Sequence, residues 1–183
     1  MNQSFQKNVT FILRPRECDA NTKLVLMVSS GPGNAVFRYL DHRGGVSQAH
    51  MMTCSRSRWR RAVAEHAQLK VVFVVAEART VKQQQQLLGE HRVHGDIVQS
   101  SVQDGHRLLA YKILMGYVWT YSACGHVPHV AKTDDNVDMD VAELLEILGS
   151  RRDGDKQFIA CSVPSRNIAT GCSVCVSSLI KQN

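Results

Sequence analysis

Four aspartates and one asparagine follow a short apolar run in HVAKTDDNVDMD, His129 to Asp140, although the chain has a formal net charge of +6. Carboxylate and amide oxygens are ligands that Mg²⁺ and Mn²⁺ prefer, and both ions complete their shell with water and phosphate. Alternate residues of an extended segment face the same side, so Asp134 and Asn136 can act together while Asp135 points away. The pattern predicts a cation site at Asp134 and Asn136 that holds a diphosphate.

This acidic segment has two other interpretations. Asp140 followed by Glu143 forms a capping box, in which both carboxylates favour the positive end of a helix. Capping can account for Asp140 and Asp138, but it leaves Asp134 and Asp135 unexplained. A calcium loop starting at Asp134 is excluded, because its sixth position is Met139 instead of Gly and its twelfth is Leu145 instead of Glu.

Four arginines surround Trp59 in SRSRWRR, and the sequence pI is about 9.1. Such a cluster can attract polyanions, whether nucleic acid, anionic lipid or the phosphates of a nucleotide. A solvated helix face is the ordinary alternative for a basic run. A nucleic-acid binder using Arg56 to Arg61 would bind with strong salt dependence, but no recognised nucleic-acid-binding motif accompanies the charge.

The six cysteines form an even count that is compatible with disulfides but too sparse for a disulfide scaffold, so the compartment stays open. Cys172 and Cys175 form a CxxC, yet no second pair lies at zinc-finger spacing, so a metal or redox role is not favoured. Residues 1–18 lack both the roughly 20 apolar residues of a membrane span and the layout of a signal peptide. As written, the chain is expected neither to span a membrane nor to enter the secretory route.

Apolar runs closed by turn residues predict strands, and longer runs between them predict helices. The expected strands are 23–30, 69–78, 95–100 and 127–133, and the expected helices are 55–68, 79–95, 104–124 and 141–150. This alternation in a chain of 183 residues predicts one α/β domain with a mostly parallel sheet between helices. The ligand crevice should lie beyond the carboxyl ends of the strands, where the acidic segment begins.

Two helices have predicted core faces. In 104–124, the spacing of Leu109, Ile113 and Tyr117 predicts a buried stripe. In 141–150, one apolar face is expected, with Gly149 as the residue that stops the helix. That face consists of Val141, Leu144, Leu145 and Leu148.

The segment Glu90 to Leu148 resembles the β1,3-galactosyltransferase family of Golgi glycosyltransferases, glycosyltransferase family 31. That family has an acidic residue before "DI", a "D…Y…LT.K" helix, a Trp, a Cys and then "K.DDD". The matching residues are Glu90, Asp96, Ile97, Asp104, Leu109, Lys112, Trp119, Cys124, Lys132, Asp134 and Asp135. Upstream, LVLMVSSGPGNAVFR resembles the first strand and "S.P.N…R" turn of the family, and RSRW resembles its "R.TW" motif.

The resemblance implies a GT-A fold, a UDP-sugar donor, Mn²⁺, and transfer of galactose or N-acetylglucosamine to a glycan acceptor in a β1,3 linkage with inversion. Protein glycosylation in the Golgi membrane is the implied setting. The implied donor-binding residues are Ser30, Arg38, Arg56, Lys132, Asp134 and Asp135, and the implied metal ligands are Asp134 and Asn136. No catalytic base is assigned, because none of the residues matches that part of the family pattern.

The expected organisation is an N-terminal extension at 1–22, a donor-binding part at 23–150 with an insertion at 39–54, and a divergent C-terminal remnant at 151–183. Three departures from the family are expected: Asn136 replaces the last aspartate, and the chain as written is expected to lack the later acceptor-binding part and the membrane anchor. Membrane association is therefore expected only through such an anchor. The alternative function is a non-catalytic, degenerate glycosyltransferase-like scaffold or partner-binding protein.

Overall fold

The computed structural model describes residues 9–34, 62–135, 140–150, 159–161 and 175–178. Within these residues the strands are β1 (Phe11–Leu13), β2 (Leu24–Ser30), β3 (Leu69–Glu77), β4 (Ile97–Gln103), β5 (His129–Asp134), β6 (Ile159–Cys161) and β7 (Cys175–Ser178). The helices include α3 (Val81–His94), the short 3₁₀ helix η3 (His106–Leu108), α4 (Leu109–Ala123) and α5 (Val141–Gly149), and residues 62–65, within the helix expected at 55–68, are helical too. The expected insertion at 39–54 lies outside the described residues.

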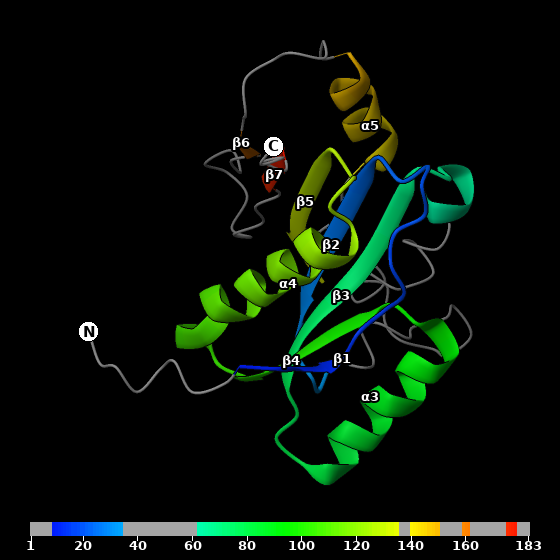
Figure 1. Cartoon of the computed structure of the whole chain (residues 1–183). Helices are drawn as coiled ribbons and strands as arrows, with labels where there is room; N and C mark the ends of the chain where they lie inside the picture. The colour runs from blue at the N-terminus through cyan, green and yellow to red at the C-terminus, as the bar shows by residue number, and fades with distance from the viewer. Residues whose placement is uncertain (1–8, 35–61, 136–139, 151–158, 162–174, 179–183) are drawn as a thin grey trace, which may run out of the picture.

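The described strands form one sheet of seven, in the order β1-β4-β3-β2-β5-β7-β6 (Figure 1). Its centre is parallel, because β2 pairs in parallel with β3 and β5, and β3 pairs in parallel with β4. Antiparallel pairs lie at the two sides, where β1 joins β4, β7 joins β5, and β6 joins β7. The predicted α/β class with a mostly parallel sheet is confirmed.

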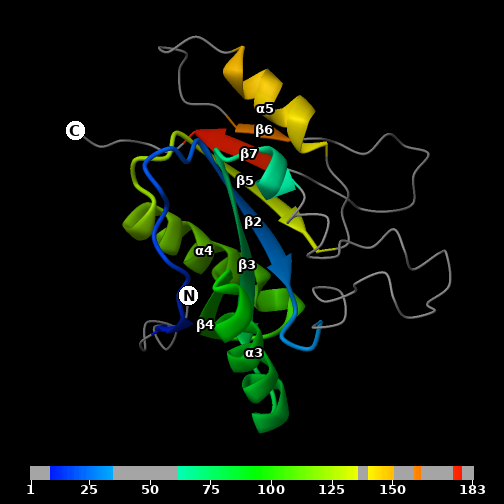
Figure 2. The ribbon, with the colours of Figure 1, turned by 90° about the vertical axis from the view of Figure 1, so that its right-hand side faces the viewer.

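The central strands β2 and β3 are rich in apolar residues because both faces of the sheet are covered. Every residue of β2 is buried, which agrees with the continuous apolar run that predicted it. On one face, α3 and α5 contribute Leu87, Val141 and Leu148 to a core with Leu26 and Phe73. On the other face α4 covers the sheet, and Figure 2 shows α4 and α5 on opposite sides of it.

The order of the strands places a topological switch between β2 and β5. The chain proceeds from β2 outward through β3 to β4, and α4 then returns it to β5 on the other side of β2. Right-handed crossovers in opposite directions put α3 and α4 on opposite faces. In sheets of this kind the connections diverge at the switch, leaving a crevice at the carboxyl ends of the two strands.

The predicted core stripe of α4 is wrong by about one residue. Leu109, Ile113 and Tyr117 are only half-buried. The buried positions of the helix are Lys112, Gly116, Trp119 and Thr120. Gly116 explains the shift, since a Cβ there would lie 2.9 Å from a methyl group of Val74, so its absence lets the helix approach the sheet closely.

Both ends of α3 and the start of α5 have capping residues that the sequence favours. Thr80 caps α3 by accepting a hydrogen bond from the Gln83 backbone, and Gly95 ends that helix in the left-handed region at φ 64°. The Asp140 carboxylate accepts from the Glu143 backbone at 3.0 Å, so the predicted cap of α5 is confirmed. The predicted stop at Gly149 is wrong, because that residue is the last one inside the helix.

A disulfide joins Cys18, which precedes β2, to Cys124, which follows α4. The Cys18 backbone N–H also donates to the Ala123 carbonyl at 3.2 Å. These bonds fix the carboxyl end of α4 beside the chain that enters the central strand. Among the described residues, none of the helices has both the length and the apolar character needed to cross a bilayer.

Candidate functional site

The candidate site lies where β2 and β5 end side by side. In the parallel register Ser29 is the partner of Asp134, and the next backbone N–H, that of Asp135, donates to the Ser29 carbonyl at 3.0 Å. Ser30 and Asp135 therefore meet although 105 positions separate them in the chain. Both predicted donor-binding segments reach the same point, at the topological switch of the sheet.

Asp135 binds the turn that follows β2. Its Oδ2 accepts a hydrogen bond from the Ser30 hydroxyl at 2.7 Å and another from the Asn34 side-chain amide at 3.0 Å. The turn is closed by the Asn34 backbone N–H, which donates to the Gly31 carbonyl at 3.1 Å. Hydrogen bonds to an ionised acceptor are among the stronger ones, so Asp135 holds the two strand ends together.

Asp134 has a different environment from its neighbour. Its Oδ1 lies 2.9 Å from Lys132 Nζ. The side chain of Asp134 is 33% exposed and that of Lys132 is 17% exposed. Side chains alternate along a strand, and Lys132 is in register with Met27, which belongs to the core under α4. Asp134 and Lys132 thus lie on the α4 side, while Asp135 interacts with Ser30.

Lys112 reaches the site from α4. It is only 7% exposed, and its Nζ donates to the Ser30 carbonyl at 3.2 Å. Burial lowers the pKa of Lys112, while the carboxylates of Asp104, Asp135 and Asp134 act in the opposite direction. Lys112 matches the lysine of the family's helix motif but is not among the predicted donor-binding residues. It is the one charged residue between Leu109 and Ala123, which was an available signal.

The residues fit a divalent cation only if phosphate completes its shell. Asp134 and Asp135 supply carboxylate oxygens of the kind that Mg²⁺ and Mn²⁺ bind. No cluster of three or more His, Cys, Asp or Glu side chains able to hold a metal occurs among the described residues. One or two carboxylates together with substrate phosphates are a common set for such ions. Asp134, whose carboxylate does not bind the β2 turn, suits an ion shared with a diphosphate.

Three predicted site residues lie outside the described residues: Arg38, Arg56 and Asn136. The basic cluster around Trp59 lies outside them as well, as does Cys172 of the CxxC. The described part of the predicted set is Ser30, Lys132, Asp134 and Asp135. The structure pairs Ser30 with Asp135 and Lys132 with Asp134 at the neighbouring ends of β2 and β5.

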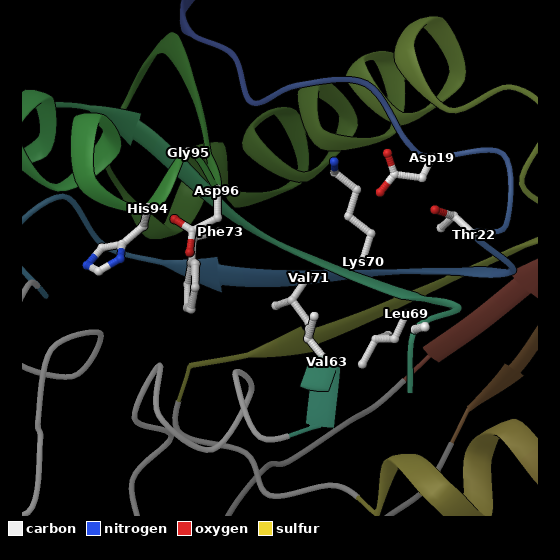
Figure 3. A pocket seen from close by; sticks show the side chains of 11 residues that line it. Asp19, Thr22, Val63, Leu69, Lys70, Val71, Phe73, His94, Gly95 and Asp96 are labelled. Carbon is white, nitrogen blue, oxygen red and sulfur yellow. The ribbon is translucent and has the colours of Figure 1, made fainter. Parts of the chain in front are cut away.

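A pocket of about 310 Å³ lies at the opposite end of the sheet, beside the start of β3 and the residues before β4. Figure 3 shows His94 and Asp96 at one end of it, Asp19 and Thr22 at the other, and Lys70 between them. Lys70 Nζ donates to the Glu17 carbonyl at 2.9 Å. This pocket is at the amino ends of the strands, away from the β2–β5 switch.

Comparisons with known proteins bear on the chain as a whole. It is 31% identical over 144 residues to the N-acetyllactosaminide beta-1,3-N-acetylglucosaminyltransferase 4 of Mus musculus, a match that covers 78% of this chain and 37% of the relative. The protein of the same name from Homo sapiens is 30% identical over 144 residues, which are 78% of this chain and 34% of the relative. The beta-1,3-galactosyltransferase 5 of Gorilla gorilla gorilla is 28% identical over 79% of this chain and 45% of the relative.

The chain thus spans about a third to a half of the length of these relatives. A solved structure of an rRNA methylase from Streptococcus thermophilus shares 12% identity and a TM-score of 0.32 over 88% of this chain and 89% of the methylase, too low to support an argument. The family described as Galactosyltransferase matches residues 53–175, which include β3, β4, α4 and β5. This match, the relatives and the arrangement of the strand ends agree with the resemblance seen in the sequence, and the chain belongs to the galactosyltransferase family.

Proposed function

We propose that this chain is the donor-binding part of a hexosyltransferase that takes galactose or N-acetylglucosamine from a UDP-sugar and forms a β1,3 linkage to a glycan acceptor. The observation that supports it most is the meeting of Ser30, Asp134 and Asp135 at the switch between β2 and β5, in a chain of the galactosyltransferase family. The proposal includes a GT-A form of the α/β fold, and a Golgi setting for the whole protein. The relatives are named for such β1,3 transfers.

In this proposal Asp134 and Asn136 hold Mn²⁺ and Asp135 assists by fixing the strand ends. Such an ion would stabilise the negative charge that a diphosphate leaving group gains. Ser30, Lys132, Arg38 and Arg56 would orient the donor, with the cationic side chains offsetting phosphate charge.

The acceptor hydroxyl must approach the opposite face of the sugar from the diphosphate, because the proposed transfer inverts the anomeric carbon. It needs a carboxylate base to accept its proton. None of the described residues is assigned this role. The chain spans 37% of the first relative, so acceptor binding is a property proposed for the whole protein.

Calorimetric titration of UDP into the purified chain, with Mn²⁺ and then with a chelator, tests the donor site. We expect micromolar binding that requires Mn²⁺ and is lost in Asp134→Asn. The matched control is Asp140→Asn, which removes the same charge at an exposed helix cap and leaves a residue that also caps helices well. Absence of binding, or equal loss in both variants, would contradict a donor site at the β2–β5 switch.

A non-catalytic scaffold is the second candidate. Two observations favour it: a neutral Asn136 stands where the family has an aspartate, and Asp134 already forms an ion pair with Lys132 at 2.9 Å. Both would weaken a metal site, since a lost charge beside a dication costs several kcal/mol at moderate effective dielectric. A folded chain that binds no UDP with Mn²⁺ present would support this function instead.

A further inference from the structure

Lys112 is a buried cation with unused donor capacity. A lysine ammonium carries three N–H donors, and the described residues provide one acceptor for it, the Ser30 carbonyl at 3.2 Å. The side chain is 7% exposed and comes from a helix that is otherwise uncharged. Burying a charge in such a position costs free energy unless the charge is paired and hydrogen-bonded.

The groups around Lys112 are mostly acidic, but none of the described ones neutralises it directly. Asp104, Asp135 and Asp134 act on it through space, with Lys132 opposing them. Asp104 interacts with Arg79, whose Nη2 lies 3.3 Å from its Oδ2, and Asp134 interacts with Lys132. Asp135 accepts from Ser30 and Asn34. Each of these carboxylates thus has a partner of its own, and Lys112 adds a positive charge beside the end of β2.

The positive charge of Lys112 has opposite effects on two ligands of the β2–β5 site. A free divalent cation is repelled by a nearby ammonium, more strongly than a monovalent ion would be, and burial reduces the screening of that repulsion. A diphosphate is attracted by the ammonium, and so is the net negative complex of a divalent metal with UDP. Lys112 therefore affects the two ligands in opposite directions.

We propose that Lys112 recognises the diphosphate, so that the site favours a metal–diphosphate complex over the free metal ion. The proposal rests on the proposed donor-binding function and assigns a selectivity role to a residue of that site. It predicts two changes of opposite sign when the charge is removed. Damage to the fold would instead lower the affinity for both ligands.

The test is calorimetry on Lys112→Met, with Mn²⁺ alone and with UDP at saturating Mn²⁺. We expect Mn²⁺ alone to bind at least threefold tighter and UDP to bind at least tenfold more weakly than in the unaltered chain. Lys112→Gln keeps a donor for the Ser30 carbonyl without the charge and must shift both affinities in the same directions. It also gives the answer if the Met variant does not fold.

Thr120→Val is the matched control, because Thr120 is fully buried in the same helix and its hydroxyl donates only within α4 and toward Met27. It should change neither affinity. Equal weakening of Mn²⁺ and UDP in both Lys112 variants, or no change in either affinity, would overturn the role of Lys112 while leaving the donor site intact. If the unaltered chain binds no UDP with Mn²⁺, the proposed function fails and this inference fails with it.

Discussion

Adjacent carboxylates have separate roles at the end of β5. Asp135 accepts two hydrogen bonds, from the Ser30 hydroxyl and the Asn34 side-chain amide at the end of β2. Asp134 is partly exposed and forms an ion pair with Lys132. Partly exposed ion pairs contribute little to stability, while hydrogen bonds to a charged acceptor contribute more. Asp135 should therefore matter mainly for the fold of the site, and Asp134 mainly for its ligand.

This difference can be measured without any ligand. We expect Asp135→Asn to lower the free energy of unfolding by about 1–3 kcal/mol, because the Ser30 hydroxyl and the Asn34 amide lose an ionised acceptor. Asp134→Asn should change it by less than about 1 kcal/mol. Urea denaturation in a chelating buffer measures both values, and a larger loss for Asp134→Asn would show that the roles are assigned the wrong way round.

At the scale of elements, the approach of α4 to the sheet depends on one small residue. A Cβ on Gly116 would lie 2.9 Å from Val74 Cγ2 and 3.0 Å from Met27 Sδ. Gly89 in α3 is a natural control, because a Cβ there would meet nothing within 4 Å. The two glycines share a helical backbone and differ in the space around them.

We expect Gly89→Ala to raise the free energy of unfolding by about 0.5–1 kcal/mol, the usual gain of alanine over glycine within a helix. Gly116→Ala should lower it, because overpacking typically costs about 1–3 kcal/mol and outweighs that gain. Chemical denaturation of the pair is the measurement. Stabilisation by both substitutions would mean that α4 does not lie this close to Val74.

The disulfide gives a second prediction at this scale. It joins residues 106 positions apart, so it constrains a long loop of the unfolded chain. We expect the double variant Cys18→Ser with Cys124→Ser to lose about 2–5 kcal/mol of stability. Reductant should destabilise the unaltered chain by a similar amount and leave the variant unchanged. If reductant has no effect, the cysteines are not joined in the protein.

Local patterns predicted the elements better than they predicted the contacts between them. The runs at β2 and β3 are apolar and bounded by turns, so their burial could be foreseen. The three-residue strands β1 and β6 have no such signal, since they exist through pairing with distant strands. Lys112 shows the same limit in the site, because its bond to Ser30 spans 82 positions and is set by the packing of α4.

At the scale of the whole molecule, the order of the strands decides which end of the sheet can bind a donor. The connections diverge at β2 and β5, and this brings Ser30 and Asp135 together. The other end has a pocket of about 310 Å³ beside Leu69 and Asp96. We expect the donor to bind at the first end, and the pocket is the alternative location.

Hydrogen–deuterium exchange with and without Mn²⁺ and UDP compares the two ends in one experiment. We predict slower exchange of the backbone amides at 28–34 and 130–135 when both ligands are present, since these segments contain the paired ends of β2 and β5. The amides at 69–73 and 94–96, which line the pocket, should be unchanged. Protection confined to the pocket, or protection at neither end, would contradict a donor site at the β2–β5 switch.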